Sequence, residues 1–562
     1  MVPQPVSDPA NQRNAAIAAE RAGRLDEAAT LFRHATDAHP FDAALLNSAG
    51  SFHARQRDHT AALAYFDRAL RQSPTHGEAI VNRAITLSAL DRKAEALDAL
   101  RSSEAHVAND PRYWSARAGM ERERGQLSAS ARSYDRCLAL NPRHPRALHG
   151  RARMALERGE TGTVTRYRQA LASGAADAEL WLGLAQAMEA EGDPAGARSV
   201  VQTLVEQAPG WIAALELLAQ LRWSSGDGQA FCDHYIDATN RQPDNAEIFR
   251  SWSRMLAGVD RFAEAADIAA TARTRFPGLD DLALVEAAYA GEGGDDLRAE
   301  RIFGMLTLDT DERHLHEARH LLRLRKPRQA EAMLERVTIN QPDAIGAWAL
   351  RDIAWRLLGD QRHHWLHGQP GLIGTQPLGI DRAEHSELVA FLDQLHDYAG
   401  WPIGQSVRNG TQTRGGLFDR CEPIVERFAK SVADAVIRHQ ESLPAADLQH
   451  PLLRHRDTPW RIVGSWSIRL TGSGRHTEHI HPLGILSSAA HLIVPDRTDD
   501  AVNTGALELG RPPPDLRIDL PPIAIIQPSE GYCALFPSTL YHGTRHFSVG
   551  KRLSVAFDVA QG

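Results

Sequence analysis

The sequence predicts two architectures in one chain: an all-α superhelix of paired helices, then a β domain of the jelly-roll type with flanking helices. Three observations lead to this prediction. Prolines and aromatic residues recur at 34-residue spacing through the first two thirds of the chain. The alanine-rich helical pattern fades near residue 368, and short apolar segments separated by Gly, Pro and Asp follow. We therefore expect a helical domain over residues 1–365 and a β domain over residues 366–562.

The size and charge of the chain narrow its possible classes. A chain of 562 residues is too long for one hydrophobic core. The formal charge of −8, from 63 basic and 71 acidic residues, gives no electrostatic reason to expect a nucleic acid or membrane partner. No apolar run reaches the roughly 18 residues of a membrane span. The polar N-terminus lacks a signal-peptide layout and the four cysteines form no CxxC pair, so we expect a cytoplasmic protein.

The repeat is clearest at the ends of successive units. Pro40 and Pro74 are 34 residues apart, and so are Phe32 and Phe66. The same interval recurs further along the chain, at Pro209, Pro243 and Pro277. In each unit a proline ends the second helix, because it cannot continue the helical hydrogen-bond ladder.

Within the first unit, Ala28, Phe32 and Ala35 occupy one face of a helix, at i, i+4 and i+7. Glycines such as Gly23 and Gly258 separate the paired helices. This pattern resembles the tetratricopeptide repeat family. The resemblance implies a concave surface that binds a protein or peptide. A scaffold or dimerisation element without a separate ligand is the alternative.

After the repeats, the pattern predicts two helices and then several short strands. The helices are expected at residues 385–400 and 417–443. The strands are expected at residues 461–472, 485–495, 505–509, 531–537 and 552–559. Short strands at this spacing are typical of a sandwich or barrel, and the prolines at 512–514 and 521–522 indicate loops or edges between them.

The candidate chemistry lies in the β domain. The segment GRHTEHIHP holds His476, Glu478, His479 and His481, and FPSTLYHGTRHF supplies His542 about 60 residues later. On an extended chain, residues i and i+2 point to the same side, so an HxH or HxE pair can bind one metal ion. A distant histidine completes three ligands and leaves positions open, which suits non-haem Fe(II), although imidazole binds zinc equally well.

The segments GSWSIRL, EHIHPLGILSSA, GYCALFPSTLYHGT and KRLSVAFDV resemble the 2-oxoglutarate- and Fe(II)-dependent oxygenases. They are most similar to the bacterial branch in which such a domain follows tetratricopeptide repeats, and QSVRNGTQTRGGL looks like the lead-in of that branch. The resemblance covers about residues 370–560. It implies a double-stranded β-helix, Fe(II) and 2-oxoglutarate as cofactors, and hydroxylation as the default reaction.

The family pattern is HxD or HxE, then a distal His, then an Arg or Lys about ten residues later. Carried over, it implies that His479 and His542 are the iron histidines. Arg552 would pair with the distal carboxylate of 2-oxoglutarate, and Ser554, two residues along the same strand, could donate a hydrogen bond to it. His491, on an intervening strand, either contacts the co-substrate or is a core histidine.

The sequence departs from the family pattern at one ligand. His481 stands where the family has an acid, which implies a three-histidine site or a two-histidine site with an open position. We favour His479 and His481 because the following segment fits the spacing to the next strand. The alternative pair is His476 and Glu478, a formal HxE.

Taken together, these features predict a 2-oxoglutarate- and Fe(II)-dependent dioxygenase whose repeats recruit a protein or peptide substrate. Two alternatives stay open. The first is a protein-interaction scaffold with a degenerate oxygenase domain. The second is a three-histidine metal oxygenase on a cupin-type barrel that does not use 2-oxoglutarate.

Overall fold

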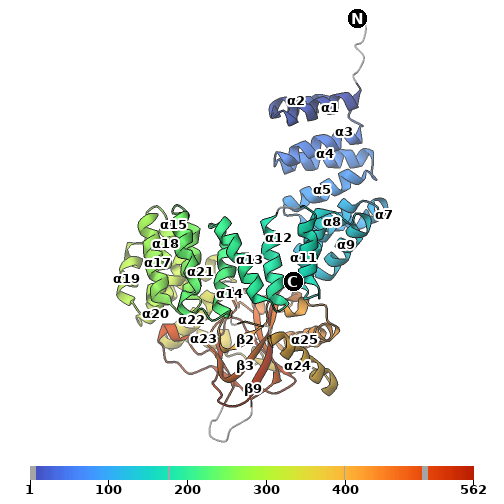
Figure 1. The fold of residues 1–562 in the computed structure, drawn as a ribbon. Coiled ribbons are helices and arrows are strands. Elements are labelled where there is room, and N and C mark those ends of the chain that lie inside the picture. The colour runs from blue at the N-terminus through green and yellow to red at the C-terminus, as the bar shows by residue number, and fades with distance from the viewer. Residues whose placement is uncertain (1–7, 175–176, 398, 401, 496–503) are drawn as a thin grey trace, which may run out of the picture. The chain divides into compact units, whose positions relative to one another are not determined.

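The computed structural model describes residues 8–174, 177–397, 399–400, 402–495 and 504–562. Residues 1–7, which belong to the segment predicted to lack a signal-peptide layout, lie outside this description. The chain forms two compact units, residues 1–183 and 184–562 (Figure 1). The domain boundary predicted at residues 365/366 falls within the second unit and stays a prediction. Among the described residues, no helix has the length and apolar character needed to cross a membrane.

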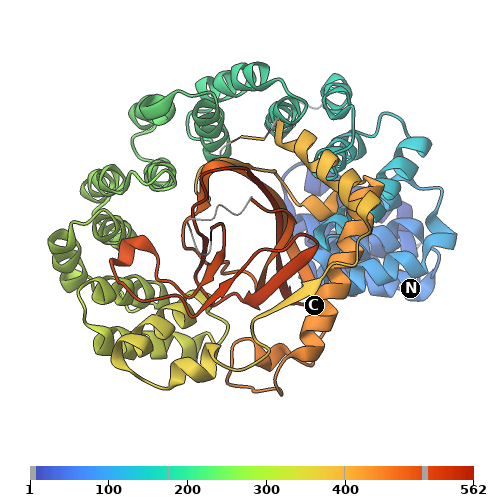
Figure 2. The same cartoon turned by 90° about the horizontal axis from the view of Figure 1, so that it is seen from below.

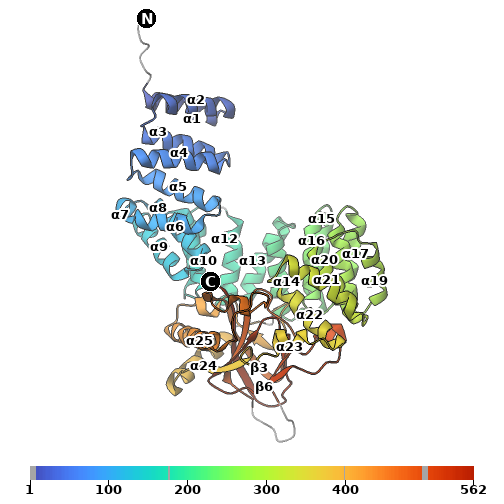
Figure 3. The same ribbon diagram turned by 180° about the vertical axis from the view of Figure 1, so that it is seen from behind.

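Helices in consecutive pairs form the repeats of both units (Figures 1 and 3). Those of the first unit are α1 (Pro9–Arg21), α2 (Leu25–Ala38), α3 (Ala43–Arg55), α4 (His59–Gln72), α5 (Gly77–Ala89), α6 (Lys93–Ser102), α7 (Glu104–Val107), α8 (Pro111–Glu123), α9 (Leu127–Leu140), α10 (Pro145–Glu157) and α11 (Thr163–Ala172). Helix α12 (Ala178–Ala190) spans the division between the units. In the second unit follow α13 (Pro194–Gln207), α14 (Ile212–Ser224), η1 (Gly228–Cys232), α15 (His234–Arg241), α16 (Ala246–Ala257), α17 (Phe262–Arg275), α18 (Asp280–Glu292), α19 (Asp296–Met305), α20 (Asp311–Arg323), α21 (Pro327–Asn340), α22 (Ile345–Leu358) and α23 (Arg362–His367). The predicted helical repeat array is confirmed.

The 34-residue period is visible in the turns between paired helices. One residue of each turn adopts a positive φ, which lets the chain reverse between two helices. Most of these residues are 34 positions apart; they are Gly23, Arg57, Asp91, Gly125, Gly159, Gly192, Gly226, Asp260, Gly294, Arg325 and Gly359. The predicted packing face of the first repeat is buried, since Ala28, Phe32 and Ala35 are at most 1% exposed.

The β domain consists of two antiparallel sheets, an arrangement consistent with the predicted jelly roll (Figure 2). The six-stranded sheet has the order β1-β7-β4-β9-β3-β2, and the three-stranded sheet has the order β6-β5-β8. The strands are β1 (Gly374–Pro377), β2 (Val407–Gln412), β3 (Trp460–His476), β4 (Leu486–Ile493), β5 (Leu507–Leu509), β6 (Ala524–Ile526), β7 (Tyr532–Pro537), β8 (His542–Thr544) and β9 (Lys551–Gln561). Each predicted strand overlaps an observed one, whereas β1, β2, β6 and β8 were not predicted because each is short or lacks clear alternation.

Strand β9 shows how the large sheet separates core from pocket. Leu553, Val555, Phe557 and Val559 pack in a core with the helices α24 (Arg382–Asp397) and α25 (Pro423–Ser442). Because successive side chains on a strand point to opposite faces, the even-numbered residues of β9 face the other way, between the two sheets. That inner face holds the candidate site.

The helix predicted from residue 417 begins later than expected. Residues Leu417–Asp419 form a short 3-10 helix, and α25 starts at Pro423. Proline favours the first position of a helix and disfavours helical backbone in the residue before it. The expectation of one continuous helix over 417–443 was therefore wrong at its N-terminal end.

In the second unit, the repeats curve around the β domain and bond to its loops (Figure 2). Arg319 and Arg323 both bind Asp515, at 2.6 and 2.8 Å, in the loop between β5 and β6. His367 donates or accepts hydrogen bonds with Asp352 of α22, at 3.0 Å, and Thr539, at 2.8 Å. The C-terminal repeats are thus part of the framework that holds the loops of the β domain.

Candidate metal centre

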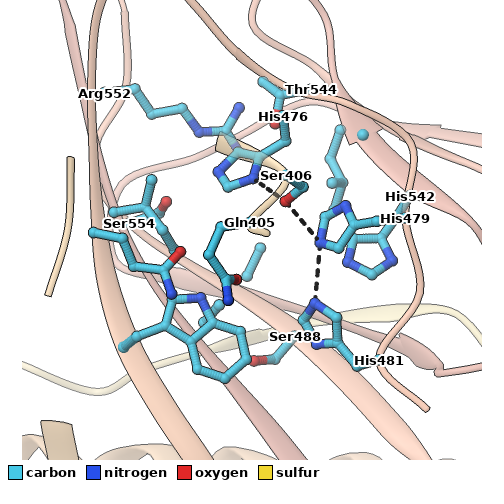
Figure 4. Close-up of a pocket in the computed structure, with 17 residues that line it drawn as sticks. Gln405, Ser406, His476, His479, His481, Ser488, His542, Thr544, Arg552 and Ser554 are labelled. Atoms are coloured by element: carbon cyan, nitrogen blue, oxygen red, sulfur yellow. Dashed lines mark hydrogen bonds between the residues drawn. The ribbon is translucent and has the colours of Figure 1, made fainter. Parts of the chain in front are cut away.

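A pocket of about 500 Å³, including its mouth, opens between the two sheets (Figure 4). The large sheet lines it with side chains from β3 and β9, and the small sheet with side chains from β5 and β8. The pocket has one end that is rich in histidine and another that contains a buried arginine.

At the first end, His479, His481 and His542 come together (Figure 4). One ring nitrogen from each lies within 4.8 Å of the others. His479 and His542 form an isolated antiparallel bridge, with backbone N–O distances of 3.1 and 2.9 Å. Residues directly opposite in such a pair project their side chains to the same face. The bridge explains why residues 63 positions apart in the sequence meet at one point.

A hydrogen bond fixes the ring orientation of each of these histidines. Nδ1 of His479 donates to the carbonyl of Thr477 at 2.8 Å, and Nδ1 of His542 donates to the carbonyl of Leu540 at 3.1 Å. With Nδ1 protonated, Nε2 keeps its lone pair. The Nε2 atoms of His479 and His481 are 3.0 Å apart. At this distance the two nitrogens can share one proton in a hydrogen bond or bind one cation.

Asp558 anchors the third histidine. Its carboxylate lies 2.5 Å from Nδ1 of His481. Asp558 was not among the predicted site residues, although it lies on the inner face of β9 at i+6 from Arg552 and i+4 from Ser554. Carboxylate–histidine pairs of this kind orient metal ligands and raise their basicity.

Burial keeps the imidazoles of His479 and His542 neutral. It lowers the pKa of His479 to about 3, with a further contribution from His481. Burial also lowers the pKa of His542 well below its usual value, and the neighbouring His479 and His481 lower it further. Neutral imidazole is the form that binds metal ions.

The alternative pair is placed differently. His476 lies beside the cluster, with its Nδ1 3.0 Å from Oγ of Ser406 and its ring 5.8 Å from that of His479. Glu478 lies against Gly543, and burial raises the pKa of its carboxyl. Within the described residues, the cluster that brings possible ligand atoms together does not include either of them.

At the other end of the pocket, Arg552 is 2% exposed. Its Nη1 donates to the carbonyl of Gly505 at 2.6 Å, while its Nε has no hydrogen-bond partner among the described residues. Burial lowers the pKa of this guanidinium to about 10. No carboxylate among the described residues forms an ion pair with it. A buried cation without a counter-ion is costly, so the arrangement suits an anionic ligand.

His491 and Ser554 lie next to each other near this arginine. The two residues are paired in the β4–β9 register, and Ser554 lines the pocket. Both ring nitrogens of His491 lack a hydrogen-bond partner. Burial, and secondarily Arg552, lowers the pKa of His491 well below its usual value. His491 is therefore a buried neutral imidazole with unused hydrogen-bonding capacity beside the arginine.

Two further parts of the pocket were not predicted as site residues. Trp466 of β3 places its ring 5.2 Å from that of His481. Gln405 and Ser406 come from the segment just before β2 and line the same pocket (Figure 4). The sequence marked their segment only through its resemblance to a lead-in region, and nothing local in it indicates a pocket.

Comparison with known families and structures gives two kinds of match. A family model described as "Putative 2OG-Fe(II) oxygenase" matches residues 464–558, which include all the candidate ligand residues named from β3 to β9. Two tetratricopeptide repeat models match the N-terminal region, one at residues 13–76 and the other at residues 53–119 and 161–221. No curated protein shows a significant match.

Several solved structures share a partial similarity with the chain. The pilF protein of Pseudomonas aeruginosa is 16% identical, with coverage of 38% of this chain and 96% of its own and a TM-score of 0.35. A tetratricopeptide repeat protein from Parabacteroides merdae is 16% identical, with coverage of 43% and 97% and a TM-score of 0.34. YrrB, described as a TPR protein with an unusual peptide-binding site, is 17% identical, with coverage of 31% and 89% and a TM-score of 0.26. The family models thus identify tetratricopeptide repeats in the N-terminal region of this chain and a domain of the 2OG-Fe(II) oxygenase type at its C-terminus.

Proposed function

We propose that the C-terminal domain is a 2-oxoglutarate- and Fe(II)-dependent dioxygenase that hydroxylates its substrate. His479, His481 and His542 would bind the iron, and Arg552 would bind the distal carboxylate of 2-oxoglutarate. The observation that carries this proposal is one pocket with three convergent imidazoles at one end and, at the other, a buried guanidinium that has no counter-ion within the described part of the chain.

The donor set fits a metal ion with open coordination positions. Each imidazole has its Nδ1 occupied by an acceptor, which leaves Nε2 for the ion. Imidazole suits Fe(II), and three protein ligands leave positions for a co-substrate and oxygen. The acid that the family carries among its ligands is replaced here by His481. We propose that Asp558, bonded to the far side of His481, supplies part of the missing negative charge through that ring.

The arginine end fits a dicarboxylate. A guanidinium binds a carboxylate through two parallel hydrogen bonds, and the free Nε of Arg552 is available for one of them. Ser554 and His491 would add hydrogen bonds from the neighbouring strands. Bound iron would activate dioxygen, the oxidant for hydroxylation, with 2-oxoglutarate as the electron donor, while the protein positions both groups and limits the access of water.

The three-histidine set alone also fits a metal oxygenase of the cupin type that does not use 2-oxoglutarate. The buried Arg552 favours the 2-oxoglutarate-dependent function. A cupin-type oxygenase that does not bind 2-oxoglutarate would have no use for a desolvated cation in its pocket. The two functions are separated by product analysis: release of succinate from 2-oxoglutarate that depends on both Fe(II) and Arg552 supports the first. Metal-dependent oxidation without succinate would support the second.

We also assign substrate recruitment to the repeats, because tetratricopeptide arrays generally bind proteins or peptides. The repeats of the second unit already bond to the β domain through α20 and α22, so the repeats of residues 1–183 are the proposed recruiting surface. A cytoplasmic location suits this function, since Fe(II) persists under reducing conditions. Peptide-array binding to the full chain tests recruitment. Equal binding by a chain that lacks residues 1–183 would contradict this assignment.

The direct test of the proposed function is an anaerobic titration of the full chain with Fe(II), followed by addition of 2-oxoglutarate and oxygen. We expect one metal ion per chain and succinate formation. A wild-type chain that binds no metal ion under these conditions would contradict the proposal and favour the non-catalytic scaffold.

A further inference from the structure

One wall of the pocket is formed by a segment that is held by the repeats. Residues 402–408, here called the wall segment, follow α24 in the chain and lead into β2. They carry Gln405 and Ser406, which both line the pocket (Figure 4). The wall segment lies outside the part of the chain matched by the oxygenase family model, residues 464–558.

On the side of the repeats, two backbone amides fix the wall segment. The amide of Ile403 donates to Oε1 of Gln220, in α14, at 2.9 Å. The amide of Gly404 donates to the carbonyl of Gly258, the C-cap of α16, at 2.8 Å. Both acceptors belong to the repeats of the second unit. The backbone amides of the wall segment therefore hold it against the repeat array.

The close approach at Gly258 leaves no room for a side chain. A Cβ added there would lie 2.6 Å from Cγ2 of Ile403 and 2.9 Å from the amide nitrogen of Gly404. Gly258 has a φ of −63°, which any residue can adopt. Its backbone conformation therefore does not require glycine, whereas its contact with the wall segment does.

An ion pair joins the next turn residue to the same segment. Nη2 of Arg408 donates to both carboxylate oxygens of Asp260, at 2.7 and 2.9 Å. Its Nη1 donates to the carbonyl of Gln405 at 2.6 Å. One guanidinium thus links a repeat turn to the part of the wall segment that faces the pocket.

On the side of the pocket, Ser406 contacts the histidine-rich segment directly. Its carbonyl accepts a hydrogen bond from the amide of Thr477 at 3.0 Å. Its Oγ lies 3.0 Å from Nδ1 of His476 and 3.2 Å from Nε2 of His479. A displacement of the wall segment would therefore uncover ring nitrogens at the candidate metal centre.

We propose that the repeat array is a structural part of the pocket: Gln220, Gly258 and Asp260 position the wall segment and so place Ser406 against His476 and His479. These repeat residues act as positioning residues for a site that they do not touch. The inference rests on contacts within the polypeptide and holds whether or not the pocket binds iron. Its test uses the metal-free full chain, so its failure is distinguishable from failure of the proposed function.

The first experiment compares Gly258→Ala with Gly304→Ala. Gly304 lies in α19 of the same array, and a Cβ there meets nothing within 4 Å. Hydrogen exchange followed by mass spectrometry reports on the backbone amides of residues 403–408, because Pro402 has no amide hydrogen. We expect Gly258→Ala to speed exchange of this peptide about fivefold, the effect of losing roughly one backbone hydrogen bond. Gly304→Ala should leave it unchanged.

The second experiment keeps the test valid if Gly258→Ala fails to fold. Asp260→Asn removes the charge opposite Arg408 but retains a residue type that tolerates the φ of +64°. Glu264→Gln is the matched control, since Glu264 pairs with Arg261 in the same turn and not with the wall segment. We expect a smaller effect, about twofold faster exchange of residues 403–408, because partly exposed ion pairs are weak.

Carbethoxylation of the histidines by diethyl pyrocarbonate, mapped by mass spectrometry, reports on the pocket itself. We expect His476 and His479 to react faster in Gly258→Ala and Asp260→Asn than in the wild type and the two controls. Unchanged exchange of residues 403–408 in both variants would overturn the proposal. Faster exchange with unchanged reactivity of His476 and His479 would overturn it as well, because the wall segment would then not determine access to the site.

Discussion

At one end of the pocket, the three clustered histidines each donate Nδ1 to an acceptor that the protein supplies, two carbonyls and the carboxylate of Asp558. At the other end, the buried Nε of Arg552 and both ring nitrogens of His491 have no hydrogen-bond partner among the residues that the structure describes. Buried polar groups are normally satisfied, so such a contrast calls for an explanation. The contrast supports the proposal that the protein preorganises the histidine end by itself, whereas a ligand completes the arginine end.

Among the tests of this contrast, the removal of a histidine ligand should have the largest effect, which is a loss of metal affinity. We expect His542→Ala to lower the affinity for Fe(II), or for Co(II) as a redox-stable probe, by more than about 100-fold. This exceeds the 10–100-fold range typical of residues that only support a metal ligand. Anaerobic calorimetric titration measures the affinity. His546→Ala, in the same segment but outside the cluster, is the control and should bind the metal as the wild type does.

Removing the arginine should affect the other end alone. In Arg552→Gln we expect about 30–100-fold weaker binding of 2-oxoglutarate to the Co(II)-loaded protein, since breaking a buried charge pair costs about 2–3 kcal/mol or more. The affinity for Co(II) itself should stay within about twofold. Equal losses of metal and 2-oxoglutarate affinity would contradict the division of the pocket into two ends.

Replacement of the same arginine should also change the stability of the ligand-free protein. Burying a charge without a partner is costly, so Arg552→Met should raise the free energy of unfolding of the ligand-free chain by about 1 kcal/mol. Thermal or urea unfolding measures this change. A destabilised Arg552→Met would indicate that the guanidinium is already satisfied within the protein.

Asp558 allows a finer test of the histidine end. Asp558→Asn preserves an acceptor for Nδ1 of His481 but removes the negative charge. We expect about tenfold weaker metal binding, at the lower end of the range for supporting carboxylates. Asp397→Asn, which alters an exposed ion pair with Arg469, is the matched control. Unchanged metal affinity in Asp558→Asn would contradict the role of Asp558 in compensating for the missing acidic ligand.

The smallest expected effect concerns His491. His491→Gln keeps one amide donor and one acceptor in a similar position, so we expect only about threefold weaker binding of 2-oxoglutarate, the value of a fraction of one hydrogen bond. Titration of the Co(II)-loaded variant measures it. An affinity equal to that of the wild type would assign His491 to the core.

The predictability of these features depends on how local their sequence signals are. The repeats could be predicted because equivalent residues of successive repeats, such as Phe32 and Phe66, are 34 positions apart in the sequence. His479 and His481 could be paired because an HxH motif needs only the two-residue period of an extended chain. Asp558 was missed although the same period, counted from Arg552, places it on the inner face of β9.

Other parts of the site could not be predicted because their positions depend on tertiary contacts. Ser406 reaches the histidines because Gly258 and Asp260, about 150 residues earlier, hold the wall segment. Strand β8 spans only His542–Thr544 and is defined by its partner β5, so it carries no period of its own. The start of α25 at Pro423 was foreseeable in principle, since proline at a first helical position is a local signal.

The most direct test is a crystal structure of the full chain with Mn(II), as a redox-stable stand-in for Fe(II), and 2-oxoglutarate. We predict an anomalous-scattering peak bonded to Nε2 of His479, His481 and His542, with the distal carboxylate of 2-oxoglutarate on Arg552. A metal ion bound by His476 and Glu478, or a dicarboxylate located away from Arg552, would contradict the account.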